Sequence, residues 1–197
     1  MKIALSNMNS RIGALELNAQ AILDSARDAD GVDVLVTPEL AMSGYPPRDL
    51  LFREGFVDRC EQTVRMLAAK LPPEMLVLVG TPRRSSNGDR CMNSVAACRG
   101  GEIIAWGDKR LLPGYDVFDD DRYFVPGEQS AIVDHKGVRI GLLICEDLWQ
   151  GGDVRERTSY EVDPVVELVE QGAQLLIAAS ASPFTTGKHA RQRDHLS

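Results

Sequence analysis

The stretch Val138–Trp149, VRIGLLICEDLW, places an apolar run directly before a cysteine and two acidic residues. A short apolar run rich in Val, Ile and Leu predicts a buried strand, so Cys145 would stand at the carboxyl end of that strand. Free cysteine is among the residues most often buried as a small hydrophobe. Cys145 is therefore either a core side chain or a nucleophile at a strand end, and this stretch alone favours the core.

The composition is that of an ordinary globular protein. Hydrophobic residues make up 44% and charged residues 26% of the 197 residues, which suits one domain with a sizeable core. The net charge is −7 with Lys and Arg scattered singly, so no basic patch predicts binding to nucleic acid or to an anionic membrane. Neither a signal peptide nor a membrane-spanning run is recognisable, and we expect a cytoplasmic protein.

The cysteines form no metal-binding pattern. None belongs to a C-x-x-C pair, and the histidines do not complete a zinc-ligand spacing with them. Structural disulfides are not expected in a reducing cytoplasm. We therefore expect no metal site, and at most one cysteine needs a chemical role. The cysteines are Cys60, Cys91, Cys98 and Cys145.

Hydrophobic periodicity predicts alternating strands and helices in the first part of the chain, followed by hairpins with Gly-containing turns. This mixture indicates an α/β or α+β fold with mixed sheets and helices outside them. Residues 109–127 are predicted to form a long irregular loop. Strands are expected at 2–6, 32–37, 75–80, 91–99, 102–107, 130–135, 138–144 and 174–179. Helices are expected at 15–29, within 49–70, at 163–171 and from 187 onward.

Three residues of different charge and chemistry follow predicted strands. Glu39 follows VDVLVT, Lys109 follows EIIAWGD, and Cys145 follows VRIGLLI. Taken alone, Glu39 could start a helix, where a carboxylate favours the dipole, and Lys109 could be a solvated surface charge. Because ligand sites of α/β proteins collect at the carboxyl ends of strands, the three side chains can also meet in space.

Together these three residues suit one reaction. A thiol needs a base to become a thiolate, and the Glu39 carboxylate can take that proton. The Lys109 ammonium can stabilise the oxyanion formed when the thiolate of Cys145 attacks a carbonyl, and the backbone N–H of Glu146 can be the second donor. The grouping therefore predicts amide hydrolysis through a thioester.

The motifs that contain these residues resemble the nitrilase or carbon–nitrogen hydrolase superfamily. They are TPEL, GDKRLLPGYDVFDDDRYF and LLICEDLW. The superfamily carries a Glu–Lys–Cys triad on a four-layer αββα sandwich, so the resemblance implies that fold, with Cys145 as nucleophile, Glu39 as general base and Lys109 as oxyanion stabiliser. SGYPPRDLLFREGF, LPGYDVFDDDRYF and CEDLW are similar to one branch, the glutaminase domains of glutamine-dependent NAD synthetases. The resemblance covers the whole chain.

The same resemblance implies a pocket for glutamine. Tyr45, Tyr115 and Glu146 would line it, while Ser182 and Lys188 would face the amino-acid end of the substrate. A carboxylate such as Glu146 can pair with the α-ammonium, and a cation such as Lys188 with the α-carboxylate.

The sequence departs from the family pattern in two ways. The family commonly has Glu second in the acid cluster after VF, as a support for the lysine, whereas this chain has Asp120, one methylene shorter. Whether Asp120 takes over that support is left open. The chain also stops before the last strands of a nitrilase domain and contains no SGGxDS motif, so we expect one carbon–nitrogen hydrolase domain, residues 1–197, incomplete at its C-terminus.

We therefore expect hydrolysis of the glutamine side-chain amide to supply ammonia for NAD synthesis. No cofactor is expected for that step, because ATP and Mg would belong to a synthetase domain absent from this chain. Expected partners are a small amide, an ammonia-accepting synthetase domain or chain, and further copies in a homo-oligomer. The alternatives are a free-standing amidase or carbamoylase of the superfamily, and an inactive truncated binding or assembly module.

Overall fold

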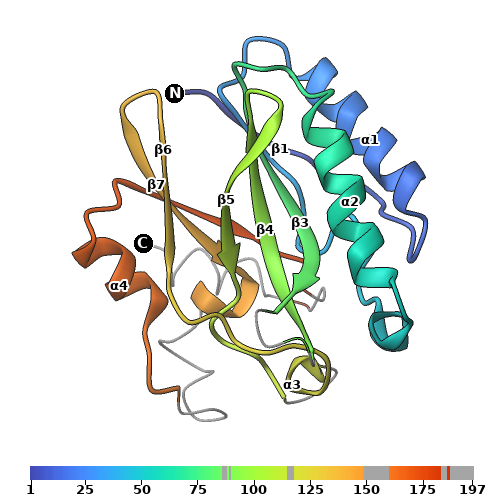
Figure 1. Ribbon diagram of the computed structural model, residues 1–197. Helices are drawn as coiled ribbons and strands as arrows, with labels where there is room; N and C mark the ends of the chain where they lie inside the picture. Colours follow the sequence, from blue (N-terminus) through green and yellow to red (C-terminus); the bar gives the residue numbers. More distant parts are fainter. Residues whose placement is uncertain (86–87, 89, 115–117, 149–159, 183–185, 187–197) are drawn as a thin grey trace.

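In the computed structural model the chain forms two β-sheets that face each other, with helices on the outer faces (Figure 1). The structure describes residues 1–85, 88, 90–114, 118–148, 160–182 and 186. The predicted αββα sandwich with mixed sheets is confirmed.

The first sheet has five strands in the order β1-β2-β3-β4-β5. β1, β2 and β3 are parallel because a helix crosses between each pair, whereas short turns make β4 antiparallel to both its neighbours. α1 and α2 lie side by side on the outer face (Figure 1). The elements are β1 (Ile3–Leu5), α1 (Leu15–Asp28), β2 (Val34–Val36), α2 (Phe56–Ala68), β3 (Leu76–Arg84), β4 (Cys91–Arg99) and β5 (Glu102–Asp108).

The second sheet has three strands in the order β6-β7-β8. β6 (Ala131–His135) and β7 (Val138–Ile144) form a hairpin, and β8 (Leu175–Ala179) lies parallel to β7 after a crossover through α4 (Pro164–Glu170). α4 begins where the Asp163 carboxylate accepts hydrogen bonds from the first backbone N–H groups of the helix.

Two apolar layers hold the four structural layers together. Strand alternation sends Val77 and Val79 of β3 toward α1 and α2, and Leu76 and Leu78 toward the second sheet. This explains the continuous apolar run of β3, because a strand covered on both faces needs apolar side chains on both. The layer between the sheets is completed by side chains such as Ile140 and Ile144 of β7.

The structure differs from the predicted helical segment 49–70 and from the predicted loop 109–127. The helical segment 49–70 divides into a 3₁₀ helix, η1 (Arg48–Phe52), and α2, because Arg53 is extended and Gly55 has a φ of 72°. The predicted loop after β5 contains one helical turn, α3 (Asp120–Tyr123). The helix expected from residue 187 lies outside the described residues.

The architecture brings the ends of several strands to one end of the molecule. β2, β3 and β5 run in the same direction, so their carboxyl ends lie at the same end of the first sheet. The segment after β2 lies directly on β3 at Gly80, whose N–H donates to Thr37 Oγ1 and whose carbonyl accepts from the Met42 N–H. Glu39 is part of this segment, so Gly80 sets how closely the Glu39 backbone approaches the sheet.

A Gly80→Ala substitution should therefore lower the free energy of unfolding by about 1–3 kcal/mol. Its Cβ would lie 2.2 Å from the Pro38 carbonyl oxygen and 2.6 Å from the Leu40 nitrogen, and neither is a flexible side-chain end. Gly137→Ala is the control, because it meets no atom within 4 Å and carries only the strain of its positive φ. Urea denaturation measures both, and equal losses in the two variants would contradict the steric role of Gly80.

Candidate active site

Lys109, which directly follows β5, lies between two buried carboxylates. Its Nζ is 2.8 Å from Glu39 Oε1 and 2.6 Å from Asp120 Oδ2. Burial disfavours the ammonium, but the charges of Glu39 and Asp120 outweigh burial and hold the pKa of Lys109 well above its ordinary value. Lys109 is only 1% exposed, so the alternative that it is a solvated surface charge is excluded.

The Glu39 carboxylate is held by partners from three further segments. Oε1 accepts hydrogen bonds from Lys109 Nζ and from Asn93 Nδ2, each at 2.8 Å. Oε2 accepts from the Ala181 backbone N–H at 3.1 Å, just after β8. With 1% exposure Glu39 does not start a solvated helix but is a buried acceptor fixed from both sheets.

Asp120 contacts Lys109 although its side chain is one methylene shorter than the glutamate of the family pattern. The carboxylate reaches Lys109 because α3 begins at this residue and brings its backbone close. Burial raises the pKa of the Asp120 carboxyl, and the Lys109 ammonium opposes that rise. In the structure, Asp120 therefore acts as the second counter-ion of Lys109.

Cys145 begins the 3₁₀ helix η2 (Cys145–Leu148) directly after β7. Its φ of 46° lies in the left-handed region, which costs a non-glycine residue of the order of 1–2 kcal/mol. Burial first, and then the charge of Glu39, raise the pKa of the thiol to about 12, against the opposing charge of Lys109. The thiol is therefore buried and electrostatically coupled to both residues. Simple core packing accounts for its burial but not for its strained backbone.

Asp147 ties the turn after Cys145 to the segment after Lys109. Oδ1 accepts hydrogen bonds from the backbone N–H groups of Arg110 and Leu111, and Oδ2 from that of Ile144, all at 2.9 Å. Burial raises the pKa of this carboxyl to about 6, and the backbone donors oppose the rise. One side chain thus fixes β7 and β5 relative to each other beside the thiol.

The predicted substrate-binding residues are only partly described. Tyr45 is half-buried, and burial together with Glu39 and Asp120 raises its pKa, so its hydroxyl stays protonated. Glu146 is buried and accepts a hydrogen bond from the Tyr160 hydroxyl at 3.2 Å. Ser182 follows β8 and is partly buried. Tyr115 and Lys188 lie outside the described residues.

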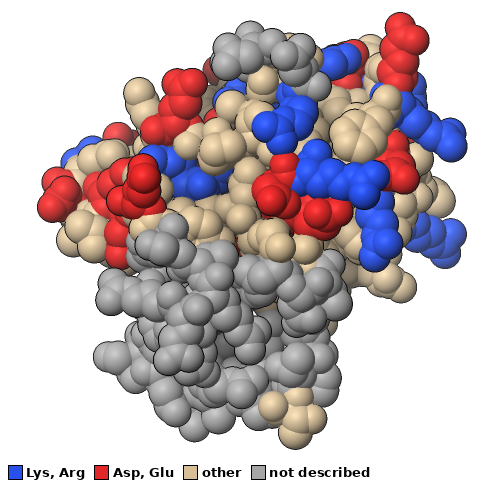
Figure 2. Space-filling model, turned by 90° about the horizontal axis from the view of Figure 1, so that it is seen from below, with Lys and Arg blue, Asp and Glu red and all other residues tan. Residues whose placement is uncertain are grey.

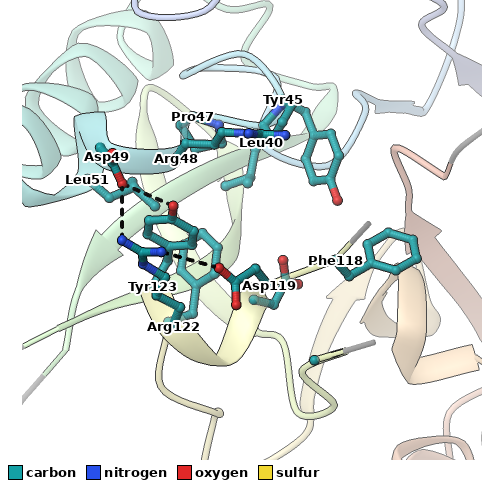
Figure 3. Close-up of a pocket in the computed structure, with 14 residues that line it drawn as sticks. Leu40, Tyr45, Pro47, Arg48, Asp49, Leu51, Phe118, Asp119, Arg122 and Tyr123 are labelled. Atoms are coloured by element: carbon teal, nitrogen blue, oxygen red, sulfur yellow. Dashed lines mark hydrogen bonds and ion pairs between the residues drawn. The ribbon is translucent and has the colours of Figure 1, made fainter. Parts of the chain in front are cut away.

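A cavity of about 780 Å³ opens beside this cluster. Tyr45 and Asp120 are among its lining residues, so its wall is continuous with the surroundings of Lys109 and Glu39. Figure 3 shows the segment around η1 on one side and α3 on the other. Hydrogen bonds and ion pairs of Asp49 with Tyr123 and Arg122 join the two sides.

The described residues give two further results on ligands and surroundings. They contain no helix long and apolar enough to cross a membrane. They also contain no group of three or more His, Cys, Asp or Glu side chains placed to hold a metal ion. Figure 2 shows the molecule from below the view of Figure 1. Among the residues that it colours, acidic and basic side chains are interspersed.

Sequence reasoning missed Asn93 and the Ala181 N–H. Asn93 lies near the start of β4, but β4 is antiparallel to its neighbours, so its start lies at the same end of the sheet as Glu39. A search restricted to carboxyl ends of strands passes over it. The pairing of strands, once known, is the signal that would have found Asn93.

A buried thiol in a strained turn, coupled to a Lys–Glu ion pair on an αββα sandwich, is the arrangement of a hydrolase of carbon–nitrogen bonds. The chain belongs to the carbon–nitrogen hydrolase family, whose model matches residues 2–197.

The similar proteins include larger enzymes. A glutamine-dependent NAD(+) synthetase from Synechocystis sp. is 43% identical over 95% of this chain and 35% of its own length. The structure of the glutamine-dependent NAD+ synthetase from Acinetobacter baumannii has a TM-score of 0.87 and 27% identity, over 98% of this chain and 35% of that one. An amidase from Nesterenkonia sp. has a TM-score of 0.75 and 25% identity, over 96% and 68%. The chain thus spans about a third of the synthetases.

An Asp147→Asn substitution should lower the free energy of unfolding by about 1–3 kcal/mol. The amide nitrogen replaces one acceptor oxygen, so at least one of the three buried backbone donors faces a donor. Asp30→Asn is the control, because Asp30 is exposed. Denaturant unfolding checks both variants, and an Asp147→Asn protein as stable as the control variant would show that the three hydrogen bonds do not hold the turn.

The rate of Cys145 alkylation by iodoacetamide should rise steadily between pH 7 and about 9.5 without reaching a plateau. Because the pKa of the thiol is about 12, the thiolate fraction still increases tenfold per pH unit throughout that range. Peptide mass spectrometry separates Cys145 from the other cysteines, with Cys145→Ala as the blank. A plateau near neutral pH would instead reveal a preformed thiolate.

Proposed function

We propose that this domain hydrolyses the side-chain amide of glutamine through a cysteine thioester and supplies the ammonia for NAD synthesis. The observation that carries the chemistry is the buried Lys109–Glu39 ion pair beside the strained Cys145 thiol. The choice of glutamine is supported by the names of the synthetase relatives and by the motifs shared with that branch.

In the first half-reaction Glu39 takes the thiol proton as Cys145 Sγ attacks the amide carbonyl carbon. The resting thiol is neutral, so proton removal accompanies attack rather than preceding it. The tetrahedral intermediate carries its charge on the former carbonyl oxygen. When it collapses, the C–N bond breaks and Glu39 returns the proton to the leaving nitrogen, which departs as ammonia and leaves a glutamyl thioester.

Lys109 is suited to stabilise the oxyanion because, within the described residues, its three N–H donors are not all used. Two of them serve Glu39 and Asp120. The third is left for the developing oxygen charge, and the backbone N–H of Glu146 supplies a second donor from the turn after Cys145. The two carboxylates keep Lys109 charged throughout.

In the second half-reaction Glu39 deprotonates a water molecule that attacks the thioester carbon. The C–S bond then breaks, the thiolate regains a proton from Glu39, and glutamate is released. One carboxylate therefore serves both steps as base and then acid, and no cofactor is required for either.

The amino-acid end of glutamine is proposed to bind in the cavity beside Tyr45. A volume of about 780 Å³ lies within the range of small-molecule sites. Tyr45 lines this cavity, and Glu146 is proposed to bind the α-ammonium. Tyr115, Ser182 and Lys188 are proposed to complete the site, with Lys188 on the α-carboxylate.

The remaining parts of the proposal concern what surrounds the domain. We place the ammonia acceptor, with its ATP and Mg, in a synthetase domain or chain, because the synthetase relatives are about three times as long as this chain. We further propose residues 1–197 as one hydrolase domain, assembly as a homo-oligomer, and a cytoplasmic location. The four cysteines are free, as a reducing compartment would leave them.

A second candidate, a free-standing amidase, is favoured by the amidase from Nesterenkonia sp., of which this chain covers 68%. That reading keeps the same half-reactions and changes only the amide. A panel of glutamine, short aliphatic amides and carbamoyl compounds separates the two. If kcat/KM for a simple amide is at least tenfold higher than for glutamine, the proposed substrate becomes the simple amide.

Incubation with a diazo-ketone analogue of glutamine should add a single adduct to Cys145. The ketone mimics the amide carbonyl, and the amino-acid end directs it into the pocket. Intact-mass analysis and peptide mapping locate the adduct. Excess glutamine should suppress labelling, whereas Cys145→Ala should remain unlabelled and Cys60→Ala should label like the wild type, because Cys60 is buried in the helix core.

Labelling of a well-folded protein at any other residue would reject Cys145 as nucleophile. Labelling at Cys145 that glutamine fails to suppress would reject glutamine while preserving the nucleophile. A folded chain that takes up no analogue and hydrolyses no amide in the panel would support the third reading, a binding or assembly module.

A further inference from the structure

Asn93 contacts both ionic residues of the site. Its side-chain Nδ2 donates to Glu39 Oε1 at 2.8 Å, and its backbone carbonyl accepts from the Lys109 N–H at 2.8 Å. The residue is 1% exposed and lies in β4, which together with β3 stands between the strands that lead to Glu39 and Lys109. A central strand therefore carries a polar side chain into the base of the site.

The orientation of the Asn93 carboxamide is fixed by its partner. A carboxylate oxygen can only accept a hydrogen bond, so the atom facing Glu39 has to be the nitrogen. The carbonyl oxygen Oδ1 is then buried without a hydrogen-bond partner among the described residues. A buried acceptor without a donor costs free energy, which indicates a donor that binds from outside the protein.

The missing donor must bind close to the catalytic carboxylate. Bond lengths limit the distance from Asn93 Oδ1 to Glu39 Oε1 to about 5.4 Å. This is the region where the proposed reaction releases ammonia, since Glu39 protonates the leaving nitrogen. An ammonia molecule has three N–H donors and can serve an acceptor on either side of it.

The hydrogen bonds of Glu39 also distinguish its two oxygens. Oε1 already accepts from Lys109 and Asn93, which occupies both of its lone pairs. Oε2 accepts only from the Ala181 N–H among the described residues, so it keeps one lone pair for a proton. Asn93 therefore influences which oxygen of Glu39 exchanges protons with the substrate.

We propose that Asn93 is a positioning residue that directs proton exchange to Glu39 Oε2, and that its Oδ1 is an ammonia site beside that atom. The second half of this inference rests on the proposed amide hydrolysis. No covalent step involves Asn93 itself: the proton moves between Glu39 and the nitrogen, and Oδ1 only accepts a hydrogen bond from that nitrogen.

Several charged or titratable groups face Glu39 besides Asn93, and any pH effect has to be read against them. Lys109, Asp120, Tyr45 and Cys145 all interact electrostatically with it. Variants of Asn93 leave these four unchanged. A shift that follows the chemistry of residue 93 therefore reports on the Asn93–Glu39 hydrogen bond.

The first experiment compares Asn93→Leu and Asn93→Asp in the pH profile of kcat/KM for glutamine. The acidic limb should move upward by about one pH unit in Asn93→Leu, because the Glu39 carboxylate loses a donor that stabilises its charge. It should move further in Asn93→Asp, where a second carboxylate adds repulsion. Asn18→Leu is the matched control, a buried asparagine whose side chain bonds to the backbone groups of Arg11 and Met42, and it should lower stability without moving the limb.

The second experiment needs no substrate. Ammonium chloride should slow the alkylation of Cys145 by iodoacetamide, at constant ionic strength, whereas tetramethylammonium chloride, which has no N–H donor, should not. The half-protecting ammonium concentration should rise about fivefold in Asn93→Leu and should not rise in Asn93→Asp, which keeps an acceptor and adds a negative charge.

The outcomes separate the two proposals. If the wild type hydrolyses no glutamine but ammonium protection depends on residue 93 as expected, the ammonia site stands and the glutaminase function falls. If glutamine is hydrolysed, but the limb stays unmoved in both Asn93 variants and protection is unchanged in Asn93→Leu, the role of Asn93 is wrong and the function stands. If the acidic limb moves in the Asn93 variants but ammonium protection of Cys145 is the same in Asn93→Leu as in the wild type, only the ammonia site is rejected.

Discussion

The ion pairs of Lys109 with Glu39 and Asp120 are the interactions on which the rest of the site depends. They join residues 70 and 11 positions apart, from the end of β2, the end of β5 and the start of α3. Burial makes each charge expensive alone, so removing one partner of a buried pair typically costs about 3–5 kcal/mol. The net stability gained from these buried ion pairs is small. Their geometry is strict, however, because Lys109 has to stay within hydrogen-bond distance of both carboxylates. This constraint fixes the Glu39 carboxylate, the base of the proposed mechanism, in the cluster that interacts with the Cys145 thiol.

The charge balance of this cluster sets the chemistry of Cys145. Two carboxylates and one ammonium leave an excess negative charge beside a buried thiol, and both burial and the Glu39 charge raise the pKa of that thiol. A preformed thiolate is therefore disfavoured, and in the proposed mechanism the base acts during attack. A neutral thiol is not held by charge, so its position depends on the backbone. The positive φ of Cys145 and the three hydrogen bonds to Asp147 fix that backbone.

Sequence reasoning was most accurate where local pattern determines structure. The strands at 91–99 and 138–144 were predicted to the residue, because tight turns or polar residues bound their apolar runs. β3 was predicted to end at Gly80 but continues to Arg84, because Pro82 is tolerated where β2 has already ended and no ladder on that side needs its N–H. Asn93 and the partners of Asp147 depend on strand pairing across the sandwich, which no local pattern encodes.

The fold and the ionic cluster define the reaction more closely than they define the amide. A synthetase and an amidase share this fold, with TM-scores of 0.87 and 0.75, so the sandwich does not choose between their substrates. The choice must come from the walls around the cluster, where the segment of η1 and the turn of α3 enclose the cavity and are joined through Asp49. These walls belong to segments between strands, and apart from Asp120 their residues can vary without removing a partner of Lys109. An ionic cluster held by the sandwich, with different walls around it, would let this fold serve different amides.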